Sequence, residues 1–305
     1  MLLSATSRKG LSLLELLVTC SILLVLFVVL AQTLWWSGNI WTGGRTRSEN
    51  RRMVRAAQDS IRKELRAAVL PVDRQTPSGR GDLQFVINPS SVPAQYKNAD
   101  AIFWQAPIAT DVSEGPFAEI GYFVRWSGNR AALCRLFLNP SESRTLLSTT
   151  DVLQRTYQHP GDWVNEDVLK AAAPADEAHG YQGLFAENVI GFWVRPLNAS
   201  GAVSYNVGTA GFDSNINFDG RAAPVLPSFI EVSYVVIDSG MANRLAERSD
   251  SSSLIATIQS LAASAKTNDA SVSPAARFLE NLKGESNLQF LLKGASQYQM
   301  IVDLR

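Results

Sequence analysis

The sequence predicts an α+β protein in which a long N-terminal helix precedes an antiparallel β-rich domain. Residues 11–34 form an apolar run with a single charged side chain, Glu15. Residues 45–70 have the three- and four-residue apolar spacing of an amphipathic helix. Beyond Pro71 the chain changes to short runs in which apolar and polar residues alternate, a pattern typical of half-buried strands.

The apolar run is long enough to cross a membrane. At about 1.5 Å of rise per residue, its roughly 24 residues cover a hydrocarbon core of ~30 Å. A secretory signal peptide has a shorter apolar region and then a small-residue cleavage site, for which Val29-Leu30-Ala31-Gln32 is a poor candidate. Trp35, Trp36 and Trp41 follow, as expected at a membrane interface. An ordinary signal anchor that happens to contain Glu15 is the alternative.

The boundaries follow from these patterns. We assign residues 1–10 to a leader, 11–36 to the transmembrane half of the helix and 37–70 to its amphipathic continuation. Pro71 ends the helix because proline cannot continue the hydrogen-bonding pattern. The predicted apolar stripe consists of Val54, Ala57, Ile61, Leu65 and Ala68.

The remaining chain is predicted to be largely β-structure. Residues 71–239 form the globular domain, with candidate strands at 83–87, 101–104, 119–126, 133–138, 189–195 and 230–237. Residues 240–285 are rich in Ser and Ala, and we expect one or two loosely tethered helices inserted there. Residues 286–305 are predicted to be a C-terminal β-hairpin, because residues 297–305 alternate like a strand.

A short motif lies at the start of the apolar run. Its residues are Arg8, Lys9, Gly10, Leu11, Ser12, Leu13, Leu14 and Glu15. A basic leader, Gly, an apolar residue, Ser or Thr, Leu, any residue and Glu form the cleavage and methylation motif of type IV prepilins. The chain therefore resembles type IV pilin-like proteins, and within them the large minor pseudopilins. One departure is Leu11, where the family usually has Phe.

The resemblance implies a pilin-like fold and specific processing. A membrane prepilin peptidase would cleave between Gly10 and Leu11, and the new N-terminus would be methylated. It also implies that Glu15 pairs with the freed amine of Leu11 on a neighbouring subunit. An ionised group inside a membrane span is expensive, and a neighbouring ammonium offsets much of that cost. Such a pair would set the axial register of a filament.

Further stretches are similar to particular subfamilies. Residues 185–194 and 226–235 resemble strands of the J-type minor pseudopilin of type II secretion. Residues 56–66 resemble the helix of the same family and of the W-type minor pilins. Residues 119–124, followed by 133–136, are similar to the Verru_Chthon cassette C type.

Composition argues against several kinds of function. The chain has 28 basic and 28 acidic side chains, which gives no electrostatic basis for binding nucleic acid. Cys20 and Cys134 lie in the span and in the domain, so we expect no intramolecular disulfide. His159 and His179 lack the neighbouring ligands of a zinc site, and no catalytic motif is present. We therefore expect no enzymatic activity.

One loop is a candidate calcium site. Its proposed ligands are Asp213, Asn215, Asn217 and Asp219. Calcium prefers six to eight oxygen ligands, and alternating Asp and Asn before Gly220 can supply several. The same residue types form Asx turns without metal, and Leu226 stands where a calcium loop has its final acidic ligand.

The favoured expectation is a structural subunit, a minor pseudopilin or minor pilin of a type II secretion or type IV pilus-like periplasmic filament. We expect the short leader to stay in the cytoplasm, a single pass through the inner membrane, and the globular domain in the periplasm. From there the protein would be extracted into a periplasmic or surface filament. The expected partners are the prepilin peptidase and other pilins or pseudopilins. The alternatives are a surface-exposed minor pilin that binds DNA or an extracellular ligand, and a membrane-anchored periplasmic enzyme.

Overall fold

A computed structural model describes residues 13–69, 84–96, 98–142, 163–179, 182–208 and 210–304, without the side chains of residues 15, 36–51, 178 and 179. The chain divides into two compact units, Met1–Arg51 and Arg52–Arg305. Helix α1 (Leu13–Arg66) contributes to both.

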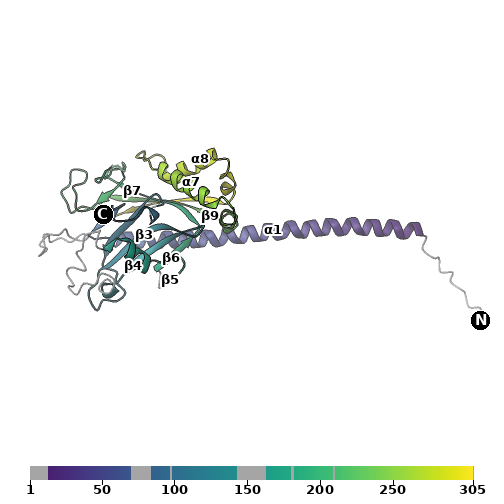
Figure 1. Cartoon of the computed structure of the whole chain (residues 1–305), viewed down its shortest axis with the longest axis horizontal. Helices are drawn as coiled ribbons and strands as arrows, with labels where there is room; N and C mark the ends of the chain where they lie inside the picture. The colour runs from purple at the N-terminus through teal and green to yellow at the C-terminus, as the bar shows by residue number, and fades with distance from the viewer. Residues whose placement is uncertain are drawn as a thin grey trace, which may run out of the picture. The chain divides into compact units, whose positions relative to one another are not determined.

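Unit 2 is built on antiparallel sheets (Figure 1). Within the described residues, the larger sheet has seven strands in the order β5-β6-β4-β3-β2-β1-β8. These strands are β1 (Phe85–Ile87), β2 (Ala101–Ala106), β3 (Ala118–Ser127), β4 (Arg130–Leu138), β5 (Ala178–His179), β6 (Gln182–Glu187) and β8 (Phe212–Asp213). The predicted strand positions between residues 101 and 138 are confirmed, whereas β5, β6 and β8 were not predicted as separate strands.

The smaller sheet has three strands in the order β10-β9-β7 in the described part of the chain. They are β7 (Val189–Leu197), β9 (Phe229–Ile237) and β10 (Ala295–Asp303). The face of β9 that the sequence predicts to be buried, with Ile230, Val232, Tyr234 and Val236, lies in the main core. Val235 and Ile237 of the opposite face are buried in that core as well, so both faces of β9 are covered. Tyr234 of β9 lies directly opposite Tyr298 of β10, and their rings stack with centroids 5.5 Å apart.

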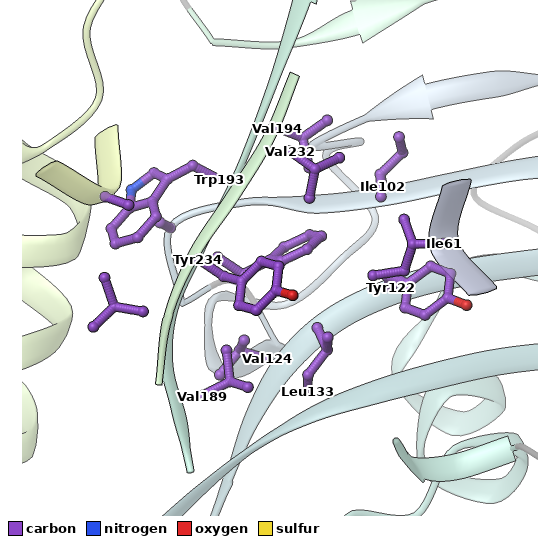
Figure 2. Packing of buried hydrophobic residues seen from close by; sticks show 14 of the residues in the cluster. Ile61, Ile102, Tyr122, Val124, Leu133, Val189, Trp193, Val194, Val232 and Tyr234 are labelled. Carbon is purple, nitrogen blue, oxygen red and sulfur yellow. The ribbon is translucent and has the colours of Figure 1, made fainter. Parts of the chain in front are cut away.

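The part of α1 in unit 2 packs with its predicted stripe inward. The four residues Val54, Ala57, Ile61 and Leu65 are buried, and so is Ala68 just beyond the helix. The helix ends at Arg66, slightly before the predicted boundary at residue 70. Figure 2 shows Ile61 of α1, Tyr122 of β3 and Tyr234 of β9 contributing to one core. The stripe therefore stabilises the domain by removing apolar surface from water.

Both faces of the large sheet are covered. Ile102 and Trp104 of β2 belong to the core beneath α1, whereas Phe103 belongs to a second core on the opposite face. This second core includes Trp163, helix α5 (Glu166–Ala172) and Tyr96 of the 3₁₀ helix η1 (Ala94–Tyr96). Strands covered on both faces read as continuous apolar runs, as β2 does.

Residues 240–285 differ from the expectation of one or two loosely tethered helices. They hold α6 (Ser239–Ala246), α7 (Ser251–Ser264) and α8 (Pro274–Gly284). Helices α7 and α8 lie over β7 and β9 (Figure 1). Trp193 of β7 donates a hydrogen bond to the carbonyl of Ala262 (2.9 Å), and its ring lies 5.4 Å from that of Phe278. The expectation of loose tethering is wrong because the Ser/Ala-rich composition concealed apolar faces that are buried in the main core.

The C-terminal region also differs from the prediction. Instead of a β-hairpin within residues 286–305, the chain forms a 3₁₀ helix, η2 (Gln289–Lys293), and then the single strand β10. The partner of β10 is β9, which lies before α6 in the sequence. Leu288 and Leu291 are buried, so this segment serves as a packed connection rather than as a first hairpin strand.

Candidate functional site

Unit 1 contains a helical stretch suited to a membrane. Leu16–Trp35 comprises 20 residues with a mean hydropathy of 2.5, and none of this stretch is buried. Its large apolar side chains are exposed on every side of the helix, as with Phe27 at 77%. A stretch of this length and composition before a globular domain is a membrane anchor or a signal sequence.

The hydroxyl groups in this stretch satisfy their own hydrogen-bonding needs. The Ser21 hydroxyl donates to the carbonyl of Leu17 at 2.8 Å. The Thr33 hydroxyl contacts the carbonyls of Val29 and Leu30 at 3.0 and 2.8 Å. Such bonds to the preceding helical turn let a hydroxyl enter hydrocarbon without leaving a polar group unpaired.

The residues of the processing motif fall at the edge of the described chain. Glu15 lies within α1 immediately before the apolar stretch, and its side chain is outside the described atoms. Gly10 and Leu11 lie outside the described residues. Their roles in cleavage and assembly therefore stay predictions.

A buried ion pair fastens α1 to the large sheet. Arg135 of β4 reaches both carboxylate oxygens of Glu64, with Nη2 2.8 Å from Oε1 and Nε 3.2 Å from Oε2. The Tyr122 hydroxyl donates to Oε2 at 2.8 Å, and the Ser60 hydroxyl donates to Oε1 at 3.2 Å. The Trp104 indole donates to the backbone carbonyl of Glu64 at 3.2 Å. One helical residue is thus held by three strands of the sheet.

The electrostatic setting makes this contact specific. The side chains of Arg135 and Glu64 are only 7% and 9% exposed. Burial, together with the charge of Glu64, raises the pKa of Tyr122 well above its ordinary value, so the phenol stays protonated and donates its hydrogen bond. The guanidinium of Arg135 also lies over the ring of Phe137, 4.3 Å from its centroid. A buried pair with this geometry fixes position, because either partner alone would be an uncompensated charge.

The sequence reasoning did not single out this anchor. Glu64 stands beside Leu65 of the predicted apolar stripe, and its neighbours Lys63 and Arg66 suggest a solvent-facing surface. The available signal was Arg135, a charged residue inside the otherwise apolar strand β4. A charge buried within a strand requires a partner from another element, and that partner proves to be Glu64.

A second buried pair holds the connection between α7 and α8. Arg195 of β7 forms a bidentate contact with Glu231 of β9, at 2.8 and 2.7 Å. The same guanidinium donates to the backbone carbonyls of Thr267, Asp269 and Val272. Through these hydrogen bonds, Arg195 attaches the polar segment between α7 and α8 to the small sheet.

The candidate calcium loop uses its polar side chains to shape the backbone. Asp213 Oδ1 accepts from the Asn215 N–H at 2.9 Å, and Asn217 Oδ1 accepts from the Ala223 N–H at 3.0 Å. Asp219 has a left-handed φ of 50° and is exposed. Among the described residues, no group of three or more His, Cys, Asp or Glu side chains could hold a metal ion. The amide oxygens of Asn215 and Asn217 can also be calcium ligands. The geometry therefore does not test calcium binding by these two residues together with Asp213 and Asp219.

The other reactive side chains are dispersed. Cys20 is exposed on α1 and Cys134 is buried in β4, and both are free thiols. Burial raises the pKa of the Cys134 thiol to about 12. His179 lies in β5, and His159 lies outside the described residues.

No family model, curated protein or solved structure matches this chain. The described residues support a chain with an N-terminal apolar helix followed by an α+β domain with antiparallel sheets.

Proposed function

We propose that this protein is a minor pseudopilin or minor pilin, a structural subunit of a type II secretion or type IV pilus-like filament. In this proposal a prepilin peptidase cleaves between Gly10 and Leu11. The apolar part of α1 holds the protein in the inner membrane, and the α+β domain lies in the periplasm. Glu15 then sets the register against the amine of a neighbouring subunit when the protein enters the filament.

The observation that carries the proposal is the dual character of α1. Its N-terminal part is apolar on all sides and unburied over Leu16–Trp35. Its C-terminal part buries one stripe and is locked to the sheet by the contact between Glu64 and Arg135. Together with the motif around Gly10 and Glu15, an unburied apolar stretch followed by a stripe packed in the domain is the arrangement that a membrane-anchored filament subunit requires.

The first test is the N-terminus of the membrane-extracted protein, made with and without a prepilin peptidase. Intact mass and N-terminal sequencing should show a chain that begins at Leu11 only when the peptidase is present. A Gly10→Val variant should remain uncleaved in both cases, because the larger side chain replaces the residue at the scissile bond. A chain that begins at Met1 in both backgrounds would refute the proposal in favour of an anchored ectodomain.

The second test concerns Glu15. We expect Glu15→Ala to insert and be cleaved normally but to fail to enter filaments, because the carboxylate that would pair with the neighbouring amine is absent. Asp59→Ala is the matched control, since Asp59 is an acidic residue of the same helix with a side chain 77% exposed. Normal filament entry by Glu15→Ala would exclude the assembly role of this residue.

A further inference from the structure

Strand β10 has a long edge, and the described part of the chain leaves most of its outward backbone groups open to a partner. It is nine residues long and ends the three-stranded sheet. At its two ends, Gly294 O accepts from the Asp238 N–H and the Leu304 N–H donates to Ser228 O, both at 3.1 Å. In an antiparallel ladder the bonded positions alternate. Even-numbered residues of β10 therefore bond to β9, and odd-numbered residues direct their N–H and C=O groups outward.

Four of these residues have outward backbone groups with no other partner within the described structure. The backbones of Ala295, Gln297, Gln299 and Ile301 bond to no segment beyond the β9–β10 ladder there. The side chains of Gln297 and Gln299 are exposed, and that of Ile301 is 54% exposed. Natural edge strands are commonly protected by Lys, Pro, a bulge or short length. The β9–β10 pairing is regular, and β10 contains neither Lys nor Pro.

The other sheet edges in the described structure are closed or short. Strands β5 and β8, at the ends of the large sheet, have two residues each. The outer edge of β7 is occupied: Phe192 O accepts from the Asp100 N–H at 3.0 Å, and the Val194 N–H donates to the Asp100 carboxylate at 2.9 Å. Among the described strands, β10 is thus the long edge that this protein can offer to another chain.

We propose that β10 pairs antiparallel with β10 of a second copy, joining two three-stranded sheets across a two-fold axis at Gln299. An antiparallel edge is complementary to itself, because a two-fold rotation brings each outward N–H opposite a carbonyl. Centring the pair on Gln299 keeps the open positions Gln297, Gln299 and Ile301 in register with their copies. This register places Ile301 opposite Gln297 and the single charge, Asp303, opposite Ala295, so no like charges meet.

The proposed pair is a closed assembly, whereas a filament repeats one contact without closure. The inference therefore goes beyond the filament role and does not depend on it. Cleavage and filament entry test the proposed filament role, whereas the association of the purified protein tests the proposed β10 pair.

The first experiment is site-directed disulfide formation in the full chain, purified in detergent. A Cys20→Ser background removes the exposed thiol, and Cys134 is buried. At a hydrogen-bonded antiparallel pair the Cα atoms lie about 5.5 Å apart, which suits a disulfide. Gln299→Cys should therefore give a covalent dimer under mild oxidation, much faster than Val112→Cys, a loop control whose native side chain is 66% exposed. Equal rates would overturn the proposal.

The second experiment measures mass by light scattering and melting temperature for a pair of proline variants. Gln299→Pro removes an outward N–H, so we expect a monomer with a nearly unchanged melting temperature. Met300→Pro removes an N–H that bonds to β9, so we expect a destabilised fold. A monomeric parent protein would overturn the proposal and leave the edge to a strand of another protein. A dimer that persists in folded Gln299→Pro would also overturn it, because the contact would then lie elsewhere.

A third experiment tests whether the strand that pairs with β10 is β10 of a second copy. Gln299→Lys and Gln299→Glu each place like charges together at the two-fold axis, so each variant alone should be monomeric. Mixing the two should restore the dimer, because opposite charges then face each other. Failure of the mixture to associate, with both variants folded, would contradict pairing centred on Gln299.

Discussion

Arg135→Ala should show how strongly the buried ion pair attaches α1 to the large sheet. The substitution removes both guanidinium contacts, at 2.8 and 3.2 Å, and leaves Glu64 in a site where its side chain is 9% exposed. The hydroxyls of Tyr122 and Ser60 remain as its hydrogen-bond donors. The variant thus creates a buried carboxylate with two neutral donors and no positive partner.

The expected loss follows from this geometry. Removing one partner of a buried pair costs about 3–5 kcal/mol in free energy of unfolding. Because two donors still contact Glu64, we expect a value near the lower limit, about 3 kcal/mol. For a domain of roughly 150–250 residues, each kcal/mol lowers the melting temperature by about 2–4 °C. The variant should therefore melt about 6–12 °C below the parent.

The assay is denaturant and thermal unfolding in detergent, followed by near-ultraviolet circular dichroism. Arg62→Ala is the matched control on the same helix: Arg62 is 40% exposed and lies 3.6 Å from Asp59. Such exposed pairs contribute about 0–1 kcal/mol. The double variant Glu64→Leu/Arg135→Met should recover part of the lost stability, because apolar residues of similar size can replace a buried pair. The recovery is incomplete because the buried Tyr122 hydroxyl loses its acceptor.

Two results would contradict the expected role of the ion pair. A loss for Arg135→Ala no larger than for Arg62→Ala would show that the buried pair does not hold the helix. A double variant as unstable as Arg135→Ala would show that side-chain packing, rather than the uncompensated charge of Glu64, causes the loss.

Four further predictions concern other parts of unit 2. Arg195→Ala should accelerate hydrogen exchange in residues 267–272, because three backbone carbonyls there lose their donor; unchanged exchange would contradict the anchoring role. In a Cys20→Ser background, thiol labelling of Cys134 at pH 8 should require unfolding, since its pKa is about 12. Stability should also fall as the pH rises above the unfolded-state pKa of about 8.5, because only the unfolded chain then loses the proton. Millimolar calcium should leave the melting temperature unchanged, because Asp213 and Asn217 already accept backbone hydrogen bonds; a rise that Asp219→Asn abolishes would establish a calcium site instead.

Much of the secondary structure could be predicted because periodicity reports which side of an element is buried. The stripe from Val54 to Leu65 and one face of β9 have this local signal, and the structure buries both, although it buries the opposite face of β9 as well. Periodicity did not reveal the buried faces of the helices in residues 240–285, because their composition is dominated by small residues. The Ser- and Ala-rich helices α7 and α8 have few large apolar residues, yet Ile258 and Phe278 are fully buried.

Local sequence patterns were enough to predict the apolar stretch, the amphipathic continuation and most long strands, and to reveal the motif around Gly10 and Glu15, because each depends on residues close together in the chain. The strand order, the burial of Glu64 against Arg135 and the position of β10 at an edge of its sheet depend on contacts between distant parts of the chain. The sequence around a charged residue or an edge strand does not show which residues will contact it. These partners lie far away in the sequence, and only folding brings them together.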